Sequence, residues 1–148
     1  MKRDVVTLLF CVYLITGTND SFSCEGLDFF EQRIRPALSG MEITAGYFSV
    51  INRSQQALKI TSLNSATLRS VTLHETIYEN GLVKMRPVPS LIIPPKTTIR
   101  AEPGGLHLML EGNLSALDKT IDIEFSCEAE SRTIEFPFTP NNFRSHDS

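Results

Sequence analysis

The fold is decided by residues 70–88, which read SVTLHETIYENGLVKMRPV. In this stretch, two runs of alternating apolar and polar side chains flank the dipeptide Asn80-Gly81. Asn-Gly is the strongest short-range signal for a β-hairpin, because a type I′ turn needs positive φ at both central residues. Counting outward from this turn pairs Thr76 with Met85 across two antiparallel strands. Since side chains alternate between faces, Met85 then lies diagonally opposite His74 on one face.

Short runs with the same alternation fill the rest of the chain, and helical periodicity is almost absent after the first residues. Turn signals such as Pro103-Gly104-Gly105 separate these runs. The pattern predicts an all-β protein, either an antiparallel β-sandwich or a Greek-key barrel. The expected strands are 43–52, 57–63, 70–79, 82–88, 97–102, 106–111, 120–128 and 133–138.

The length and the ends of the chain predict its domain organisation. With 148 residues, of which 41% are hydrophobic, it can form one domain with a substantial core. Two basic residues, an apolar run and a small-residue end at 21–23 are typical of a secretory signal, and the run is shorter than the roughly 20 residues that span a bilayer. We therefore expect a signal peptide over residues 1–23, with cleavage after Thr18 as the alternative, a β-sandwich over 24–138 without an integral membrane segment, and a flexible polar tail over 139–148.

Removal of residues 1–23 leaves two of the three cysteines, Cys24 and Cys127. In an oxidising compartment they form a disulfide, or else Cys127 is a small buried residue on the same strand face as Phe125. A mature chain that starts at Cys24 is also compatible with a lipid anchor there, although Ser21 stands where the acylation motif requires a Leu-like residue. The sequence leaves both questions open.

Composition and motifs exclude several classes of function. The net charge of −3 gives no basic surface for nucleic acid or anionic lipid. The chain has no C-x-x-C redox motif, and it shows no Ser/His/Asp set, paired acid cluster or phosphate-binding glycine loop. We therefore expect a binding protein and not an enzyme.

Four His and Met side chains occupy strand faces that core residues do not. In 106–110, three leucines point to one side, whereas His107 and Met109 point to the other. His74 likewise lies opposite its apolar strand neighbours. Thioether sulfur is a poor ligand for hard cations and selects copper(I), whereas zinc prefers thiolate, imidazole or carboxylate. The sequence therefore predicts a copper(I) site built from His74, Met85, His107 and Met109.

Three neighbouring residues have simpler interpretations. Met41 precedes the first of these strands, and we interpret it as a packing residue rather than a fifth ligand. Glu75 alternates to the face opposite His74, which favours a structural role. Arg86 is interpreted as a solvated charge, with a partner contact as the alternative.

The spacing H-x10-M-x21-H-x-M, from His74 through Met85 to His107 and Met109, resembles the ligand signature of the PCuAC family of periplasmic copper chaperones. The flanking segments LHE, MRPV, IPP and PGGLHLML are also similar to that family, and the resemblance extends over residues 46–138. It implies a cupredoxin-like β-sandwich that binds copper(I) through these four residues in the periplasm. It also implies delivery of copper to the cytochrome c oxidase subunit that carries the dinuclear copper site, or to another copper-handling protein.

The chain departs from the PCuAC pattern at both ends of the domain. The family's Trp-x-Arg motif appears here as Gln32-Arg33, which we interpret as a difference in packing. The His- and Met-rich tail of some members is absent, and His146 alone remains there.

Other functions stay open at this stage. The chain is alternatively a secreted β-sandwich interaction module, or a copper-scavenging or storage protein without a delivery role. An enzyme that uses Cys24 and Cys127 as a redox pair is the third alternative.

Overall fold

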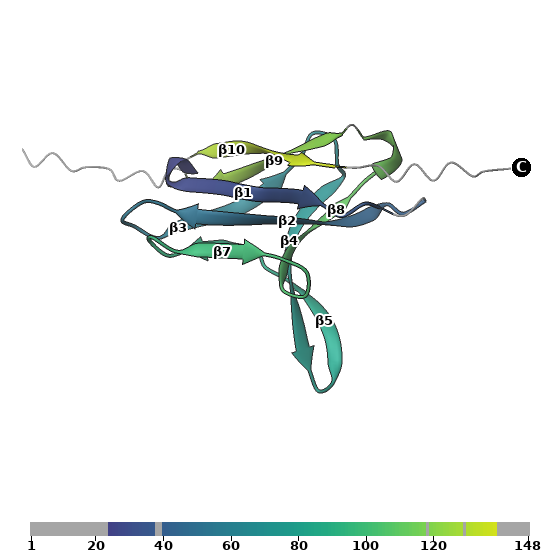
Figure 1. Cartoon of the computed structure of the whole chain (residues 1–148), viewed down its shortest axis with the longest axis horizontal. Coiled ribbons are helices and arrows are strands. Elements are labelled where there is room, and N and C mark those ends of the chain that lie inside the picture. Colours follow the sequence, from purple (N-terminus) through teal and green to yellow (C-terminus); the bar gives the residue numbers. More distant parts are fainter. Residues whose placement is uncertain (1–23, 38–39, 118, 129, 139–148) are drawn as a thin grey trace, which may run out of the picture.

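The computed structural model describes residues 24–37, 40–117, 119–128 and 130–138, which form two antiparallel sheets packed face to face (Figure 1). The first sheet has the strand order β1 (Leu27–Ile34), β2 (Ile43–Asn52), β8 (Leu106–Glu111), β4 (Ser70–Glu79) and β5 (Leu82–Pro87), and β7 (Thr98–Ala101) also pairs with β2. The second has the order β10 (Ser131–Pro137), β9 (Thr120–Cys127), β3 (Leu58–Asn64) and β6 (Leu91–Ile93). Two 3-10 turns, η1 (Cys24–Gly26) and η2 (Leu114–Ala116), complete the described elements. The predicted antiparallel β-sandwich is confirmed.

All eight strands expected from alternation are present, but β1 and β6 were not predicted. In β1 the alternation breaks at Glu31, which has a φ of 58°, and the register with β2 shifts between Phe30 and Arg33. Such a bulge hides a strand from a period-two pattern. β6 has only three residues and is defined by its pairing with β3, which is a tertiary contact.

The core lies between the sheets and is rich in aromatic side chains. The ring of Phe125 on β9 lies 4.6 Å from Phe29 and 5.4 Å from Phe48, measured between centroids, so that the two sheets interlock. Alternate residues of β9 face this core: Ile121, Ile123, Phe125 and Cys127 are all buried. The outward faces are therefore free to carry other chemistry.

Cys24 and Cys127 form a disulfide with their Cα atoms 5.6 Å apart. Both residues are buried. The sequence left open whether Cys127 is a disulfide partner or a small buried residue, and it is both. The bond attaches η1 to the end of β9. A sulfur atom in a disulfide cannot also carry a thioether-linked lipid, so Cys24 can have one or the other. The structure contains the disulfide.

The hairpin of β4 and β5 has the predicted turn and register. Asn80 and Gly81 have φ values of 52° and 76°, and Thr76 lies opposite Met85. β8 begins opposite Glu75, so the outer part of β4 has only β5 beside it. The hairpin therefore projects from the sandwich, across the direction of β1, β2 and β7 (Figure 1).

One edge of β2 is shared by two strands. β8 pairs with residues 43–46 of β2, and β7 pairs with residues 48–51. Tyr47 lies at the changeover, where the loop between β7 and β8 turns away through Gly104, which has a φ of 83°. The strand pairing along this edge of β2 is therefore interrupted at Tyr47, beside the base of the projecting hairpin.

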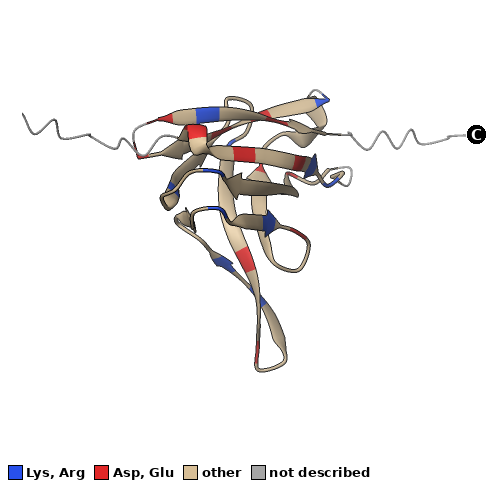
Figure 2. Ribbon diagram, turned by 60° about the vertical axis from the view of Figure 1, so that its left-hand side comes forward, with Lys and Arg blue, Asp and Glu red and all other residues tan. Residues whose placement is uncertain are grey.

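Charged residues of both signs are interspersed over the described surface (Figure 2). Exposed ion pairs such as Arg53–Asp28 and Lys84–Glu79 combine them locally. None of the helices in the described ranges is long and apolar enough to cross a bilayer. The predicted signal (1–23) and tail (139–148), with His146, lie outside the described residues.

Candidate metal centre

A cavity of about 470 Å³ opens where β2 changes partner from β8 to β7. Met85 from β5, His107 from β8 and Met109 from β8 all line it. Three of the four predicted ligands therefore share one space. They come from two strands that are not adjacent in the sheet, because β4 lies between them.

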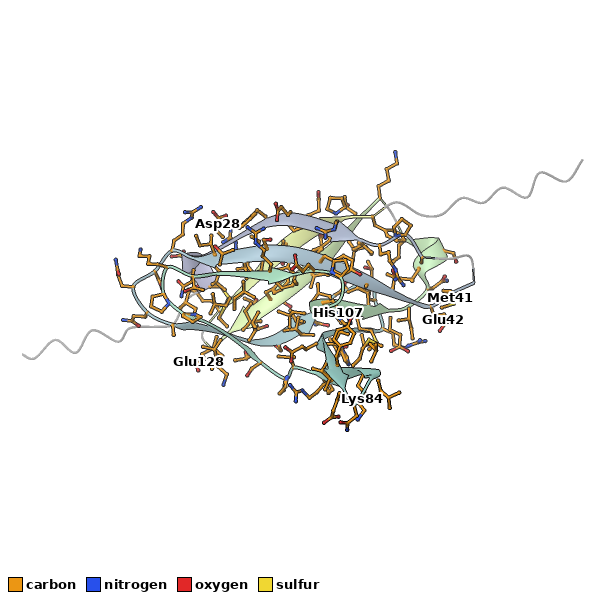
Figure 3. The ribbon with its side chains drawn as sticks, turned by 60° about the horizontal axis from the view of Figure 1, so that its bottom comes forward. Asp28, Met41, Glu42, Lys84, His107 and Glu128 are labelled. Atoms are coloured by element: carbon orange, nitrogen blue, oxygen red, sulfur yellow. A yellow bond between two sulfur atoms is a disulfide. The ribbon has the colours of Figure 1, made fainter. Side chains whose placement is uncertain are left out.

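His107 is the most buried of the four residues, with 8% of its surface exposed. Its Nδ1 lies 2.9 Å from the carbonyl oxygen of Gly105, to which it donates a hydrogen bond. A neutral imidazole that donates from Nδ1 presents an unprotonated Nε2 as a metal ligand. The short loop that leads into β8 thus sets both the tautomer and the orientation of this ring. Figure 3 shows His107 at the centre of this side of the molecule.

His74 lies directly opposite His107 on β4. The two imidazole rings are stacked, with centroids 6.2 Å apart and an interplanar angle of 26°. The Nδ1 of His74 lies 3.3 Å from the hydroxyl of Thr72. Unlike the other three predicted ligands, His74 does not line the cavity.

Met85 and Met109 lie on opposite sides of this histidine row. Met85 is level with Thr76, two positions beyond His74 on β4, whereas Met109 is level with Thr72, two positions before it. On a flat sheet their Cα atoms would be about 16 Å apart, farther than two methionine side chains can bridge through one ion. In the folded chain, Met85 on the projecting hairpin and Met109 on β8 line the same cavity.

The donor set suits a soft monovalent ion. No three His, Cys, Asp or Glu residues in the described part of the chain are grouped so that they could hold a metal. Cys24 and Cys127 are committed to a disulfide and offer no thiolate. The cavity instead offers thioether sulfur from methionine and imidazole nitrogen from His107, a donor combination that favours a soft ion such as copper(I).

The two charged residues beside the site are paired with each other. Arg86 on β5 lies directly opposite Glu75 on β4, and its Nη2 is 3.1 Å from the carboxylate Oε2 of Glu75. Both side chains lie on the face opposite His74 and Met85. The structural role expected for Glu75 therefore agrees with this pair, and Arg86 is a paired charge.

Two further residues, Met41 and Tyr47, line the cavity, and strand alternation did not predict either of them. Met41, from the segment before β2, lines it and is 53% exposed, which does not agree with its interpretation as a packing residue. Tyr47 also lines it, and the guanidinium of Arg33 lies 5.0 Å from the centre of the Tyr47 ring. Arg33 had already been noted in the sequence as part of the altered Trp-x-Arg motif. No local sequence pattern pointed to Tyr47.

A protein family described as "Putative lipoprotein LpqE-like" matches residues 28–138. The chain belongs to this family. A relative in Leifsonia xyli subsp. xyli, described as "Putative lipoprotein Lxx21020", is 32% identical over 95 residues, which cover 64% of this chain and 56% of the relative. The match of this LpqE-like chain thus spans little more than half the length of that curated relative.

Solved structures with a similar fold include PCuAC domains. The "Copper-bound PCuAC domain from PmoF2" has a TM-score of 0.63 at 19% identity and covers 78% of this chain and 93% of its own. The copper(I) form of DR1885 from Deinococcus radiodurans has a TM-score of 0.58 at 23% identity and covers 78% of each chain. This LpqE-like chain therefore has the β-sandwich fold of the PCuAC domains.

Proposed function

We propose that this LpqE-like protein is an exported copper(I) carrier in which His74, Met85, His107 and Met109 hold one ion. The observation that carries the proposal is the convergence of two methionines and a buried, oriented histidine on one cavity. The copper-bound state of two structural neighbours supports it. The leader-like residues 1–23 and the lipoprotein family support export, and we propose the periplasm as the compartment.

The geometry favours carriage over permanent storage of the ion. Met85 is 62% exposed and lies on the projecting hairpin, whereas His107 forms the buried end of the site. An incoming ligand from an acceptor can approach on the Met85 side while His107 and Met109 still hold the ion. Stepwise ligand exchange then transfers copper without releasing it to water.

The exposed apolar residues around the hairpin tip give the acceptor a place to approach. Tyr78, Leu82 and Val83 are each more than half exposed, on the two strands that carry His74 and Met85. We propose that the acceptor is a copper protein, with the dinuclear copper subunit of cytochrome c oxidase as the first candidate. A scavenging or storage role without an acceptor is the alternative within the same chemistry.

The test is a competition titration of the purified mature protein with a coloured copper(I) chelator under reductant. We expect one copper(I) ion per chain and little competition from zinc. The variant Ile92→Leu, an exposed apolar residue on the other sheet, is the matched control and should bind as the wild type does. If the wild type withdraws no copper from the chelator, the carrier proposal is wrong and the interaction module becomes the better description.

A second measurement separates delivery from storage. Copper-loaded protein is mixed with the soluble, copper-free domain of the oxidase subunit, and metal is measured on each after separation. Transfer supports the carrier. Retention of the ion by the loaded protein supports storage.

A further inference from the structure

Arg33 on β1 lies in the same row of the first sheet as His107. It pairs with Tyr47 on β2, and its guanidinium lies 5.0 Å from the centre of the Tyr47 ring. The register of β2 and β8, in which Gly46 lies opposite Leu108, puts the next residue, Tyr47, level with His107. Alternation directs both side chains to the ligand face. The positive charge of Arg33 is therefore two strands away from His107, with only Tyr47 between them.

Arg35 has the corresponding place in the row of Met109. It directly follows β1, and its amide donates a hydrogen bond of 2.8 Å to the carbonyl oxygen of Ala45. Ala45 in turn lies opposite Met109 on β8. The side chain of Ala45 is small, and Arg35 lines the cavity on the same face as Ala45 and Met109. Because neighbouring strands are about 4.8 Å apart, the Cα atoms of Arg35 and Met109 are separated by about 10 Å.

Three carboxylates near these rows are bound to other arginines. Glu31 lies 3.4 Å from Arg100, and Glu42 and Glu111 lie 2.9 Å and 2.7 Å from Arg69. In the described part of the chain, the two arginines beside the ligand rows form no salt bridge with a carboxylate. Among the described residues, the wall of the cavity likewise contains no Asp or Glu. An ion in the cavity is therefore exposed to uncompensated positive charge.

This positive charge acts differently on monovalent and divalent ions. The energy of repulsion between an ion and a guanidinium is proportional to the charge of the ion, so zinc(II) is repelled twice as strongly as copper(I) at the same position. Imidazole and thioether are neutral donors and do not offset the difference. Donor chemistry alone discriminates less completely, because the imidazole nitrogen of His107 is also an ordinary zinc ligand.

We propose that Arg33 and Arg35 are specificity-determining residues of the metal site, which disfavour divalent ions through their charge. The proposal rests on the copper(I) site proposed above. Thioether sulfur selects for a soft ion, and the two arginines add a separate selection for a single positive charge. Neither arginine is a metal ligand, and both act on the ion across the ligand face of the sheet.

The test compares the affinities for copper(I) and zinc(II) in Arg33→Gln, Arg35→Gln and the double variant, measured by chelator competition. For charges about 10 Å apart near a protein surface, each substitution should raise copper(I) affinity by about two- to tenfold. Zinc(II) affinity should rise by about the square of the same factor, because the ion has twice the charge. Lys59→Gln removes the same charge from an exposed position of β3 on the other sheet, and it should leave both affinities near their wild-type values.

Two further measurements separate charge from packing. Arg35→Lys keeps the charge and should keep the wild-type ratio of copper(I) to zinc(II) affinity, and the effects of the Gln variants should shrink as salt is added. If the wild type binds one copper(I) ion but the double variant binds zinc(II) no more tightly, or both affinities change by one common factor, the charge inference is wrong and the carrier proposal stands. If the wild type binds no copper(I), the proposed function fails, and this inference fails with it.

Discussion

His107 and Met109 show how much chemistry two positions on one strand can define. The hydrogen bond from Nδ1 of His107 to Gly105 leaves Nε2 available as a ligand atom, and alternation puts Met109 on the same face two residues later. Neither side chain is needed by the core, which is supplied by Leu108 and Leu110 from the opposite face. Ligand chemistry and stability are therefore separable at these residues.

The first residue-scale prediction concerns Met109→Leu. Leucine keeps the apolar volume, so the free energy of unfolding should change by less than about 1.5 kcal/mol. The loss of a thioether ligand should lower copper(I) affinity by about tenfold or more, equivalent to at least about 1.4 kcal/mol. Chelator competition and chemical denaturation of the copper-free protein measure the two effects. Equal copper affinity in the variant and the wild type would remove Met109 from the ligand set.

The second residue-scale prediction concerns Glu111, whose pKa is lowered by hydrogen bonds from Arg69 and then Ser70, and by the charge of Arg69. A lowered pKa in the folded state means that this carboxylate stabilises the fold above its unfolded pKa, and that the contribution is lost as pH falls through the folded pKa. In Arg69→Gln the pKa of Glu111 should rise toward its ordinary value. An NMR titration of the Glu111 carboxyl carbon tests this, and Arg53→Gln, which breaks a distant exposed ion pair, is the control. An unchanged pKa in Arg69→Gln would contradict it.

At the scale of elements, the β4–β5 hairpin does more than present Met85. β8 ends its pairing with β4 at Glu75, so the outer hairpin depends on its own turn and cross-strand pairs. All residues of β5 are exposed, so little burial stabilises this strand. The proposed copper site thus combines a packed part on β8 with a part on the hairpin that can open locally.

The element-scale prediction is that Gly81→Ala loosens this hairpin. Gly81 has a φ of 76°, a conformation that costs an L-residue about 1–2 kcal/mol. We expect faster hydrogen exchange at the amides of β5, weaker copper(I) binding, and little change in the exchange of β9. Val83→Thr, an exposed substitution on the same hairpin, is the matched control. Unchanged exchange in β5 would show that the turn does not limit hairpin opening.

For the whole molecule, the disulfide and the proposed copper site occupy different parts of the fold. The Cys24–Cys127 bond attaches η1 to the second sheet, whereas the cavity is built from the first sheet and its loops. It closes a loop with a sequence separation of 103 residues, so it restricts the unfolded chain strongly. Stability should therefore respond to oxidation, and the copper ligands should not.

The whole-molecule prediction is that the double variant Cys24→Ser/Cys127→Ser loses about 2–5 kcal/mol of unfolding free energy, as expected for a native disulfide in a small exported domain. Reduction of the wild type should have a similar effect. Denaturant unfolding with and without reductant measures both. While the variant remains folded, it should still bind one copper(I) ion with wild-type affinity. Loss of copper binding in the folded variant would place a cysteine in the site.

Local rules account for the parts of the fold that the sequence predicted. Turn chemistry fixed the Asn80-Gly81 hairpin and its register, and alternation located eight strands and the faces of His107 and Met109. The same rules failed at β1, where a bulge at Glu31 breaks the period, and at β6, which is too short to show one.

The sequence by itself therefore determined the strands and the faces of His74, Met85, His107 and Met109, because these depend on turn geometry and on the two-residue repeat of a strand. Only the tertiary structure decided that Met41, Met85, His107 and Met109 line one cavity, and that Cys24 pairs with Cys127. The physical reason is that sheet twist, the changeover on the edge of β2 and the packing of two sheets act between residues far apart in the chain.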